Sequence, residues 1–319
     1  MKVALFGGTG FVGSYIVDEL VTREHHPRLM VRSGSEGKVP KPEYCETVSG
    51  DIHDDYAIRK TLYDCDAAIY LIAVIREFPK EGINNELLQF RGAQRVANIS
   101  LEVGVKRFLL MSALGTSCRP GASKYFKAKH LAEQAVKNTE LSWTILRPSS
   151  IFGDPRGFER PEFCTMLKKD MLNLVSFPRF LPFPAPSFFT GMNPLDSGNF
   201  ELSMIHVTDV AKIFVHALED ESTIGETLEL GGDRAVTWNE IIRSIAVGSN
   251  KNIIMTPAPF FVVWFSALLL DRFKWFPVAR DQLQDLVNGN TCDSSKIFDE
   301  YGMKPIPFTS DNLTYLSNH

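Results

Sequence analysis

Residues 3–13 read V-A-L-F-G-G-T-G-F-V-G, and this stretch decides the fold of the chain. Val3–Phe6 is short and wholly apolar, which is typical of a strand buried on both faces of a parallel sheet. Three glycines follow at three-residue spacing, and residues 11–20 have helical character. Glycines let the backbone turn tightly and approach a pyrophosphate, while the helix start offers N–H groups to that anion. The stretch predicts a dinucleotide-binding turn, with an ordinary strand-to-helix turn as the alternative.

Size and charge narrow the class of protein. The chain has 319 residues, of which 44% are hydrophobic, so it can bury a sizeable core in one large or two fused domains. Its formal net charge of −4 gives no electrostatic support for binding nucleic acid. No apolar run reaches the roughly 18 residues of a membrane-spanning helix, and none at the start is typical of a signal peptide. We expect a cytoplasmic protein.

The cysteines predict neither a disulfide framework nor a metal site. They are odd in number and widely scattered, at Cys45, Cys65, Cys118, Cys164 and Cys292. Neither a C-x-x-C pair nor a cluster of histidines accompanies them.

Strands and helices alternate over the first half of the sequence, which is typical of a parallel α/β sheet. Further strands are predicted at residues 28–31, 46–49, 67–71, 107–111 and 143–146, and further helices at residues 84–103 and 125–137. We therefore predict a doubly wound, Rossmann-like domain over residues 1–152 and a smaller C-terminal α/β lobe over residues 153–319. A predicted helix and strand within residues 205–230 are candidates to return to the first domain.

The residue at the end of the second predicted strand bears on the choice of nucleotide. An acidic side chain there binds the adenosine ribose of NAD, whereas an arginine accommodates the 2′-phosphate of NADP. This sequence has Arg32 at that place, with Lys38 nearby, which favours NADP(H) over NAD(H). An ordinary surface arginine is the alternative. Asp51, Ile52 and Ala73 follow the next two strands and are expected to border the adenosine.

Tyr125 and Lys129 are a tyrosine and a lysine at a spacing that lets their side chains interact. They lie four residues apart in a predicted helix, so they share one face of it. An isolated tyrosine has a pKa of about 10, and a neighbouring lysine cation lowers that pKa toward neutrality. The spacing alone is common, since Tyr56 and Lys60 also have it, but only the first pair follows the fifth predicted strand.

Several motifs in this order resemble the extended and atypical short-chain dehydrogenase/reductase family. They are the glycine turn, Ser112-Ala113-Leu114-Gly115, Tyr125-x-x-x-Lys129, Arg147-Pro148-Ser149-Ser150-Ile151-Phe152-Gly153 and His206-Val207-Thr208-Asp209-Val210-Ala211. Within the family, the turn at residues 112–115 and residues 280–283 are similar to the branch of the nucleotide-binding accessory subunit of respiratory complex I. The family resemblance extends over most of the chain.

The resemblance implies roles for the matched residues. The glycine turn would cradle the pyrophosphate, Pro148 would border the nicotinamide, and Lys129 would hold the nicotinamide ribose while Tyr125 acts as general acid or base. Together, the candidate cofactor-binding residues are Gly7, Thr9, Gly10, Phe11, Val12, Gly13, Arg32, Asp51, Ile52, Ala73, Tyr125, Lys129 and Pro148. The resemblance also implies that the second half of the chain covers the nicotinamide as a substrate lobe.

Two departures from the family pattern leave catalysis open. Ala113 and Leu114 occupy the places where a serine or threonine often completes the catalytic set, which leaves Ser112 as the third catalytic candidate, or Thr116 or Ser117 in its place. Gln89 stands where the family has a structural asparagine. Two roles for Tyr125 stay open, catalysis or merely positioning the cofactor.

The second half contains two unusual apolar segments. Residues 177–189, F-P-R-F-L-P-F-P-A-P-S-F-F, carry prolines that exclude a regular helix or a central strand. Their rings either line a cleft for an apolar substrate or pack the smaller lobe. Residues 258–270 form the strongest apolar run, and a helix over residues 258–276 either belongs to the core or lies in a membrane interface.

The sequence therefore supports two main functional interpretations. The first is an NADP(H)-dependent oxidoreductase or epimerase-like enzyme acting on a small, apolar substrate. The second is a non-catalytic NADP(H)-binding scaffold or assembly factor of a membrane-associated respiratory complex, peripheral to the inner face of the membrane. A redox sensor that signals through a partner is a third interpretation, with no sequence feature of its own.

Overall fold

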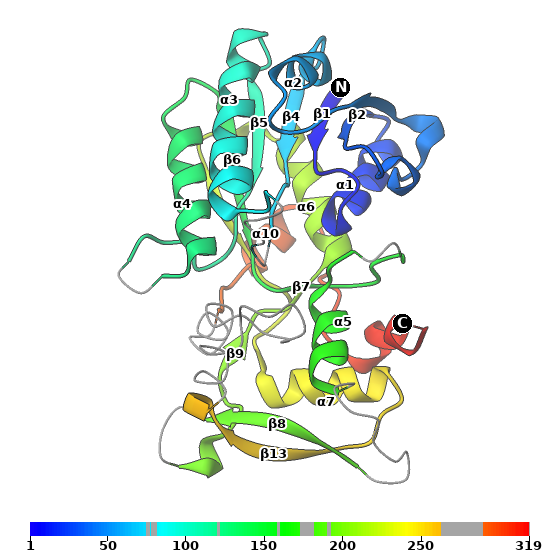
Figure 1. Ribbon diagram of the computed structural model, residues 1–319, viewed down its shortest axis with the longest axis vertical. Helices are drawn as coiled ribbons and strands as arrows, with labels where there is room; N and C mark the ends of the chain where they lie inside the picture. Colours follow the sequence, from blue (N-terminus) through cyan, green and yellow to red (C-terminus); the bar gives the residue numbers. More distant parts are fainter. Residues whose placement is uncertain are drawn as a thin grey trace. The chain divides into compact units, whose positions relative to one another are not determined.

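The computed structural model describes residues 1–74, 77, 82–119, 122–157, 160–172, 182–189, 193–262 and 290–318 (Figure 1). The chain divides into two compact units, each assembled from two stretches of sequence. Unit 1 comprises Met1–Pro148 and Val207–Leu230, and unit 2 comprises Ser149–His206 and Gly231–His319. The first stretch of unit 1 thus ends before Phe152, the last residue of the domain predicted from the sequence.

A seven-stranded parallel sheet forms the centre of unit 1, in the order β11-β6-β5-β4-β1-β2-β3. Its strands are β1 (Lys2–Phe6), β2 (His26–Val31), β3 (Glu46–Ser49), β4 (Ala67–Tyr70), β5 (Arg107–Met111), β6 (Ser142–Pro148) and β11 (Thr227–Leu230). The chain builds outward from β1 to β3 and then from β4 in the opposite direction. The order therefore reverses between β1 and β4, where doubly wound sheets bind their ligands. The predicted Rossmann-like fold is confirmed.

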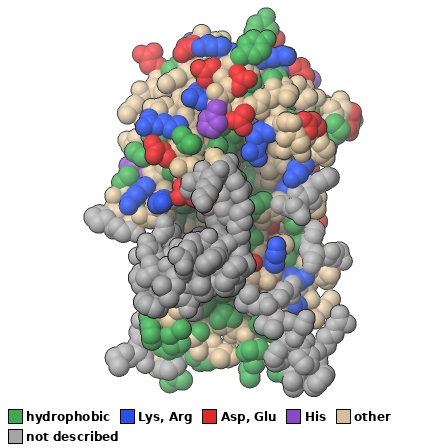
Figure 2. All heavy atoms as spheres, in the orientation of Figure 1, with side chains coloured by type: hydrophobic (Ala, Val, Ile, Leu, Met, Phe, Trp, Pro, Cys, Tyr) green, Lys and Arg blue, Asp and Glu red, His purple; other side chains and the backbone are tan. Residues whose placement is uncertain are grey.

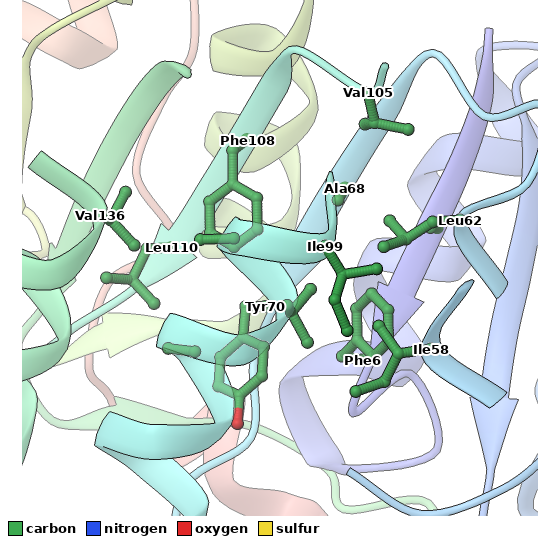
Figure 3. Packing of buried hydrophobic residues seen from close by; sticks show 14 of the residues in the cluster. Phe6, Ile58, Leu62, Ala68, Tyr70, Ile99, Val105, Phe108, Leu110 and Val136 are labelled. Carbon is green, nitrogen blue, oxygen red and sulfur yellow. The ribbon is translucent and has the colours of Figure 1, made fainter. Parts of the chain in front are cut away.

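The helices of unit 1 are amphipathic and cover the sheet. They are α1 (Phe11–Thr22), α2 (Asp55–Leu62), α3 (Gly92–Glu102), α4 (Lys124–Lys137) and α6 (Val207–Glu219). One core cluster joins the sheet to α2, α3 and α4, and in Figure 3 Phe6, Tyr70 and Phe108 of adjacent strands reach toward these helices. The Phe6 and Tyr70 rings stack with their centroids 6.3 Å apart. Helix α6, which comes from the second stretch of unit 1, packs against α1.

The helix predicted over residues 84–103 is divided in the structure. It consists of a π-helical turn, η4 (Glu86–Arg91), followed by α3. The hydroxyl of the buried Tyr70 donates a hydrogen bond to the carbonyl of Leu88. A Cβ at Gly92 would lie 2.2 Å from that hydroxyl oxygen, so the glycine makes room for it. The tyrosine thus competes for a helical carbonyl, which favours the wider turn.

Unit 2 consists of short paired strands and helices. Its strand pairs are β7 (Ile151–Phe152) with β10 (Ile205–His206), β9 (Glu201–Leu202) with β12 (Val236–Thr237), and β8 (Phe183–Phe189) with β13 (Ile253–Pro259). Its helical elements are α5 (Phe163–Leu167), η5 (Lys168–Leu172), η6 (Pro194–Asp196), α7 (Trp238–Gly248), α10 (Ser295–Glu300) and η8 (Ser310–Asn318). At the start of α7 the Thr237 hydroxyl accepts the Glu240 N–H at 3.3 Å. The Glu240 carboxylate pairs with Arg234 at the surface.

The proline-rich stretch is partly described, and its residues 183–189 form β8. This strand pairs in parallel with β13 in a two-stranded sheet, so it is neither helix nor central strand, as predicted. Phe183 donates its N–H to the carbonyl of Asn252 at 2.8 Å. The prolines Pro184 and Pro186 occupy alternate positions of the same strand.

Most of the apolar segment at residues 258–276 lies outside the described residues, as do residues 280–283. Its first residues are described, and Phe261 and Val262 are 71% and 47% exposed. Ile254 of β13 and Leu195 of η6 are exposed as well. Figure 2 shows hydrophobic side chains at the surface over the part of unit 2 that contains β8 and β13. Among the described helices, none is long and apolar enough to cross a bilayer.

Candidate functional site

The glycine turn connects β1 to α1 at the carboxyl edge of the sheet. Gly7 has a φ of +100°, a conformation that glycine adopts without strain. Its carbonyl accepts the Gly10 N–H at 3.1 Å, which closes the turn. A Cβ at Gly13 would lie 2.2 Å from the Gly7 oxygen and 2.8 Å from the Gly8 Cα. The first turn of α1 therefore packs directly on the loop.

The start of α1 is suited to an anion. Its N-cap residue, Gly10, has no side chain that could accept hydrogen bonds from the first-turn N–H groups, and no side chain among the described residues caps the helix. These N–H groups belong to residues 11–13 and carry the positive end of the helix dipole. A close-packed, uncapped turn of this kind fits a diphosphate group.

The residues predicted to face the adenosine follow the carboxyl ends of neighbouring strands. Arg32 is exposed directly after β2, and its carbonyl accepts the Ser35 N–H at 2.9 Å in a tight turn. Asp51 follows β3 and accepts the His53 N–H at 3.1 Å, while Ile52 is buried. Ala73 follows β4 and is partly exposed. Because β4, β1, β2 and β3 are adjacent in the sheet, these residues lie along one edge beside the glycine turn.

Tyr125 and Lys129 lie on the first turns of α4, which the Ser123 hydroxyl caps by accepting the Phe126 N–H at 3.2 Å. Lys129 is only 2% exposed. Its Nζ donates to the carbonyl of Met111, the last residue of β5, at 2.7 Å and lies 5.9 Å from the Tyr125 ring centroid. Burial lowers the pKa of Lys129 to about 7, and the nearby Glu133 carboxylate opposes that shift. The charge of Lys129 therefore changes near neutral pH.

The hydroxyl of Ser112 is engaged in a buried network. It donates to Glu133 Oε1 at 2.5 Å and lies 3.2 Å from the hydroxyl of Thr116. The Thr116 hydroxyl in turn donates to the Ala113 carbonyl at 2.6 Å. Glu133 is fully buried and accepts a two-pronged bond from Arg147, Nε at 2.8 Å and Nη2 at 2.6 Å. The sequence analysis missed Glu133, although its spacing from Lys129 repeats the spacing between Tyr125 and Lys129.

Two further predicted positions are held by short contacts. Pro148, at the end of β6, accepts the Leu114 N–H at 2.9 Å, which ties the turn after β5 to the neighbouring strand. Gln89 replaces the family's asparagine and donates to the Val74 carbonyl at 3.3 Å and to Asn85. Its Oε1 is buried and lacks a hydrogen-bond partner among the described residues.

Comparison with known proteins agrees with this geometry. Residues 7–163 match a family model described as NAD(P)H-binding. The chain is 25% identical to the mitochondrial NADH-ubiquinone oxidoreductase 40 kDa subunit of Neurospora crassa, over 99% of this chain and 78% of that protein. It is 26% identical to a ceramide reductase of Caulobacter vibrioides, over 81% of this chain and 74% of that protein.

A solved structure supports the fold. The chain superimposes on Thermus thermophilus UDP-glucose 4-epimerase in complex with NAD with a TM-score of 0.70. The match covers 100% of this chain and 98% of the epimerase at 16% identity, a level that bears on the fold alone. Residues 7–163 thus match an NAD(P)H-binding family model, and nearly the whole chain is similar to the 40 kDa subunit of NADH-ubiquinone oxidoreductase.

Proposed function

We propose that the protein binds NADP(H) and acts as an oxidoreductase or epimerase-like enzyme on a small, apolar substrate. The observation that carries this proposal is the buried Lys129, which is bonded to the end of β5 beside the Tyr125 ring. Burying a lysine in a merely structural role is costly, and perturbed ionisable groups concentrate at functional sites. The relative named ceramide reductase supports both reduction chemistry and an apolar substrate.

Each residue has a defined task in this proposal. Residues 7–13 hold the pyrophosphate, and Asp51, Ile52 and Ala73 border the adenosine. The bound nicotinamide supplies or takes up a hydride. Tyr125 gives the substrate oxygen a proton or removes one, and the Lys129 ammonium stabilises the ionised phenol and holds the ribose. The Ser112 hydroxyl donates its hydrogen bond to Glu133, so Ser112 is a weak candidate for direct catalysis.

Arg32 would recognise the 2′-phosphate, so Arg32→Ala is expected to discriminate between the two nucleotides. Charge-assisted bonds to a phosphate contribute about 1.5–3 kcal/mol, which corresponds to roughly 10- to 100-fold weaker NADPH binding. NADH binding should change little. Fluorescence titration with each nucleotide measures both affinities, and Arg59→Ala on α2 removes another exposed arginine as a control. An equal loss for NADPH and NADH would exclude a phosphate-specific role.

A second candidate function is a non-catalytic NADP(H)-binding scaffold beside a membrane-associated complex. Engagement of Ser112 by Glu133 favours it, as does the similarity to a subunit of NADH-ubiquinone oxidoreductase. The exposed Phe261 and Val262, at the start of the apolar run 258–270, are consistent with peripheral contact with the inner face of a membrane. Flotation with anionic liposomes tests that contact, and complete recovery in the soluble fraction would exclude it.

Nucleotide exchange separates the two candidates. The protein is purified gently, any bound nucleotide is identified, and its replacement by labelled NADPH is followed over time. Exchange within seconds supports an enzyme whose cofactor is recharged during turnover. Retention for hours in one redox state supports the scaffold. If no nucleotide is bound or taken up, both candidates are wrong.

A further inference from the structure

A buried charge network lies one helical turn beyond the proposed Tyr125–Lys129 pair. Its centre is the carboxylate of Glu133, which is fully inaccessible to solvent. Ser112 after β5 and Arg147 of β6 both donate to this carboxylate, so α4 is fastened to two adjacent strands. Lys129 fastens the same helix to Met111. The network therefore sets how the first turns of α4 lie against the edge of the sheet.

The contacts of Ser112 extend this control to the turn after β5. The Ser112 N–H donates to the Leu146 carbonyl at 2.7 Å, while its side chain reaches Glu133. Farther along the turn, the Leu114 N–H donates to the Pro148 carbonyl and the Thr116 hydroxyl donates to the Ala113 carbonyl. Loss of the Glu133 carboxylate would remove the hydrogen bond that ties the Ser112 side chain to α4. The same turn and Pro148 border the proposed cofactor site.

The network contains more basic than acidic side chains. It contains two basic side chains, Lys129 and Arg147, and one buried carboxylate. The second carboxylate near Arg147, Glu229, is 47% exposed and 3.4 Å from Nη1. Since water screens exposed charges and buried charges interact strongly, Glu133 is the anion that matters most to Lys129.

We propose that Glu133 is a positioning residue that holds the turn at Ser112 through hydrogen bonds and serves as the buried counter-charge of Lys129, one helical turn away, at the cofactor site. This inference rests on the proposed NADP(H) site, because it assigns Lys129 a charged partner in the bound nucleotide. It goes beyond that proposal by placing control of the site in a residue that touches neither cofactor nor substrate. Glu133 would act through Lys129 and Ser112.

The charged groups around Lys129 can be named element by element. On α4 itself, the titratable side chains one turn away on the same face are Tyr125 and Glu133. Strand β6 contributes Arg147, which is bonded to Glu133. The segments η4 and α3 also pack against α4, and their charged side chains lie at or near the surface. These side chains form ion pairs of their own, Arg91–Glu86, Arg95–Asp55 and Glu102–Arg59. Glu133 is thus the dominant counter-charge.

The first test needs no nucleotide. Because burial lowers the pKa of Lys129 to about 7 from an ordinary value of 10.5, the unfolded chain binds more protons between these values. The contribution of Lys129 to the free energy of unfolding should therefore rise with pH above about 7, and the melting temperature should rise with it. Lys129→Met should abolish that rise. In Glu133→Gln the carboxylate no longer supports the ammonium, so the rise should begin about 1–2 pH units lower. Glu229→Gln, which neutralises the exposed partner of Arg147, is the matched control and should leave the onset unchanged.

The second test measures NADPH affinity as a function of pH. The wild-type affinity should fall as Lys129 loses its proton, and Glu133→Gln should move that fall to lower pH by a similar 1–2 units or so. Glu133→Asp, which keeps the charge on a shorter side chain, should restore most of the wild-type profile. A structural role alone would lower affinity without moving its midpoint.

The outcomes distinguish failure of the inference from failure of the proposed function. If folded Glu133→Gln has the wild-type onset in the stability test, the inference is overturned. If the onset shifts but the wild type binds no NADP(H) at any pH, the proposed function fails and the link to cofactor binding fails with it. Should Glu133→Gln not fold, the onset is compared between Arg147→Met and the double variant Glu133→Leu/Arg147→Met. Loss of Glu133 in that background should lower the onset by about 1–2 pH units, and equal onsets overturn the inference.

Discussion

Replacing Gly13 by alanine is expected to abolish NADPH binding and to destabilise unit 1 by about 3 kcal/mol. The added Cβ would lie 2.2 Å from the Gly7 oxygen and 2.8 Å from the Gly8 Cα, and both atoms belong to the backbone. Neither atom can rotate away as a side chain can, so α1 has to move off the loop. The helix start would then no longer be placed for the pyrophosphate.

Fluorescence titration and chemical denaturation of Gly13→Ala measure the two effects. Gly37→Ala is the matched control, because a Cβ at Gly37 would meet nothing within 4 Å. It should bind NADPH like the wild type. If Gly13→Ala binds NADPH with unchanged affinity, the close packing of α1 on the glycine turn is not what forms the site.

Arg147→Met is expected to lower the free energy of unfolding by about 3–5 kcal/mol, because it leaves the Glu133 carboxylate buried without its ionic partner. The Glu133 side chain is 0% exposed and the Arg147 side chain 21%, so water cannot replace the lost bonds effectively. Denaturant titration, followed by a probe in unit 1, measures the change.

An exposed ion pair provides the control for this prediction. Arg234 and Glu240 are 51% and 38% exposed, so Arg234→Met should cost less than about 1 kcal/mol. The double variant Glu133→Leu/Arg147→Met should recover part of the lost stability, because it removes the unpaired Glu133 carboxylate while leaving Lys129 without its counter-charge. Equal effects of Arg147→Met and Arg234→Met would show that burial does not strengthen the Glu133–Arg147 pair.

The sheet of unit 1 could be predicted from the sequence because its information is local. Apolar runs such as Val3–Phe6 identify buried strands, and their alternation with helices favours parallel order. The division of the helix at residues 84–103 could not be predicted. It depends on Tyr70, which lies on β4 and reaches the Leu88 carbonyl only in the folded chain.

The candidate site shows the same contrast. The sequence predicted that Arg32, Asp51 and Ala73 follow the ends of strands. Parallel pairing brings those strand ends to the same edge of the sheet. It proposed Ser112 for catalysis, whereas the structure shows its hydroxyl bonded to Glu133. Nothing in the spacing indicated that Arg147 would also reach Glu133, because that contact depends on how α4 lies against β6.

The prolines of β8 have a consequence for assembly of the protein with other chains. Phe183 directs its N–H toward β13, and alternate residues of a strand face the same way, so Pro184 and Pro186 fall on the opposite side. An incoming strand would find no N–H donor at either proline and could not extend a regular ladder there. On that same side the Pro186 carbonyl already accepts a hydrogen bond from Trp238 Nε1 at 2.9 Å, and the Phe188 carbonyl accepts one from the Gly198 N–H at 2.6 Å. Contacts within unit 2 and the missing N–H groups together close this border of a two-stranded sheet to further strands.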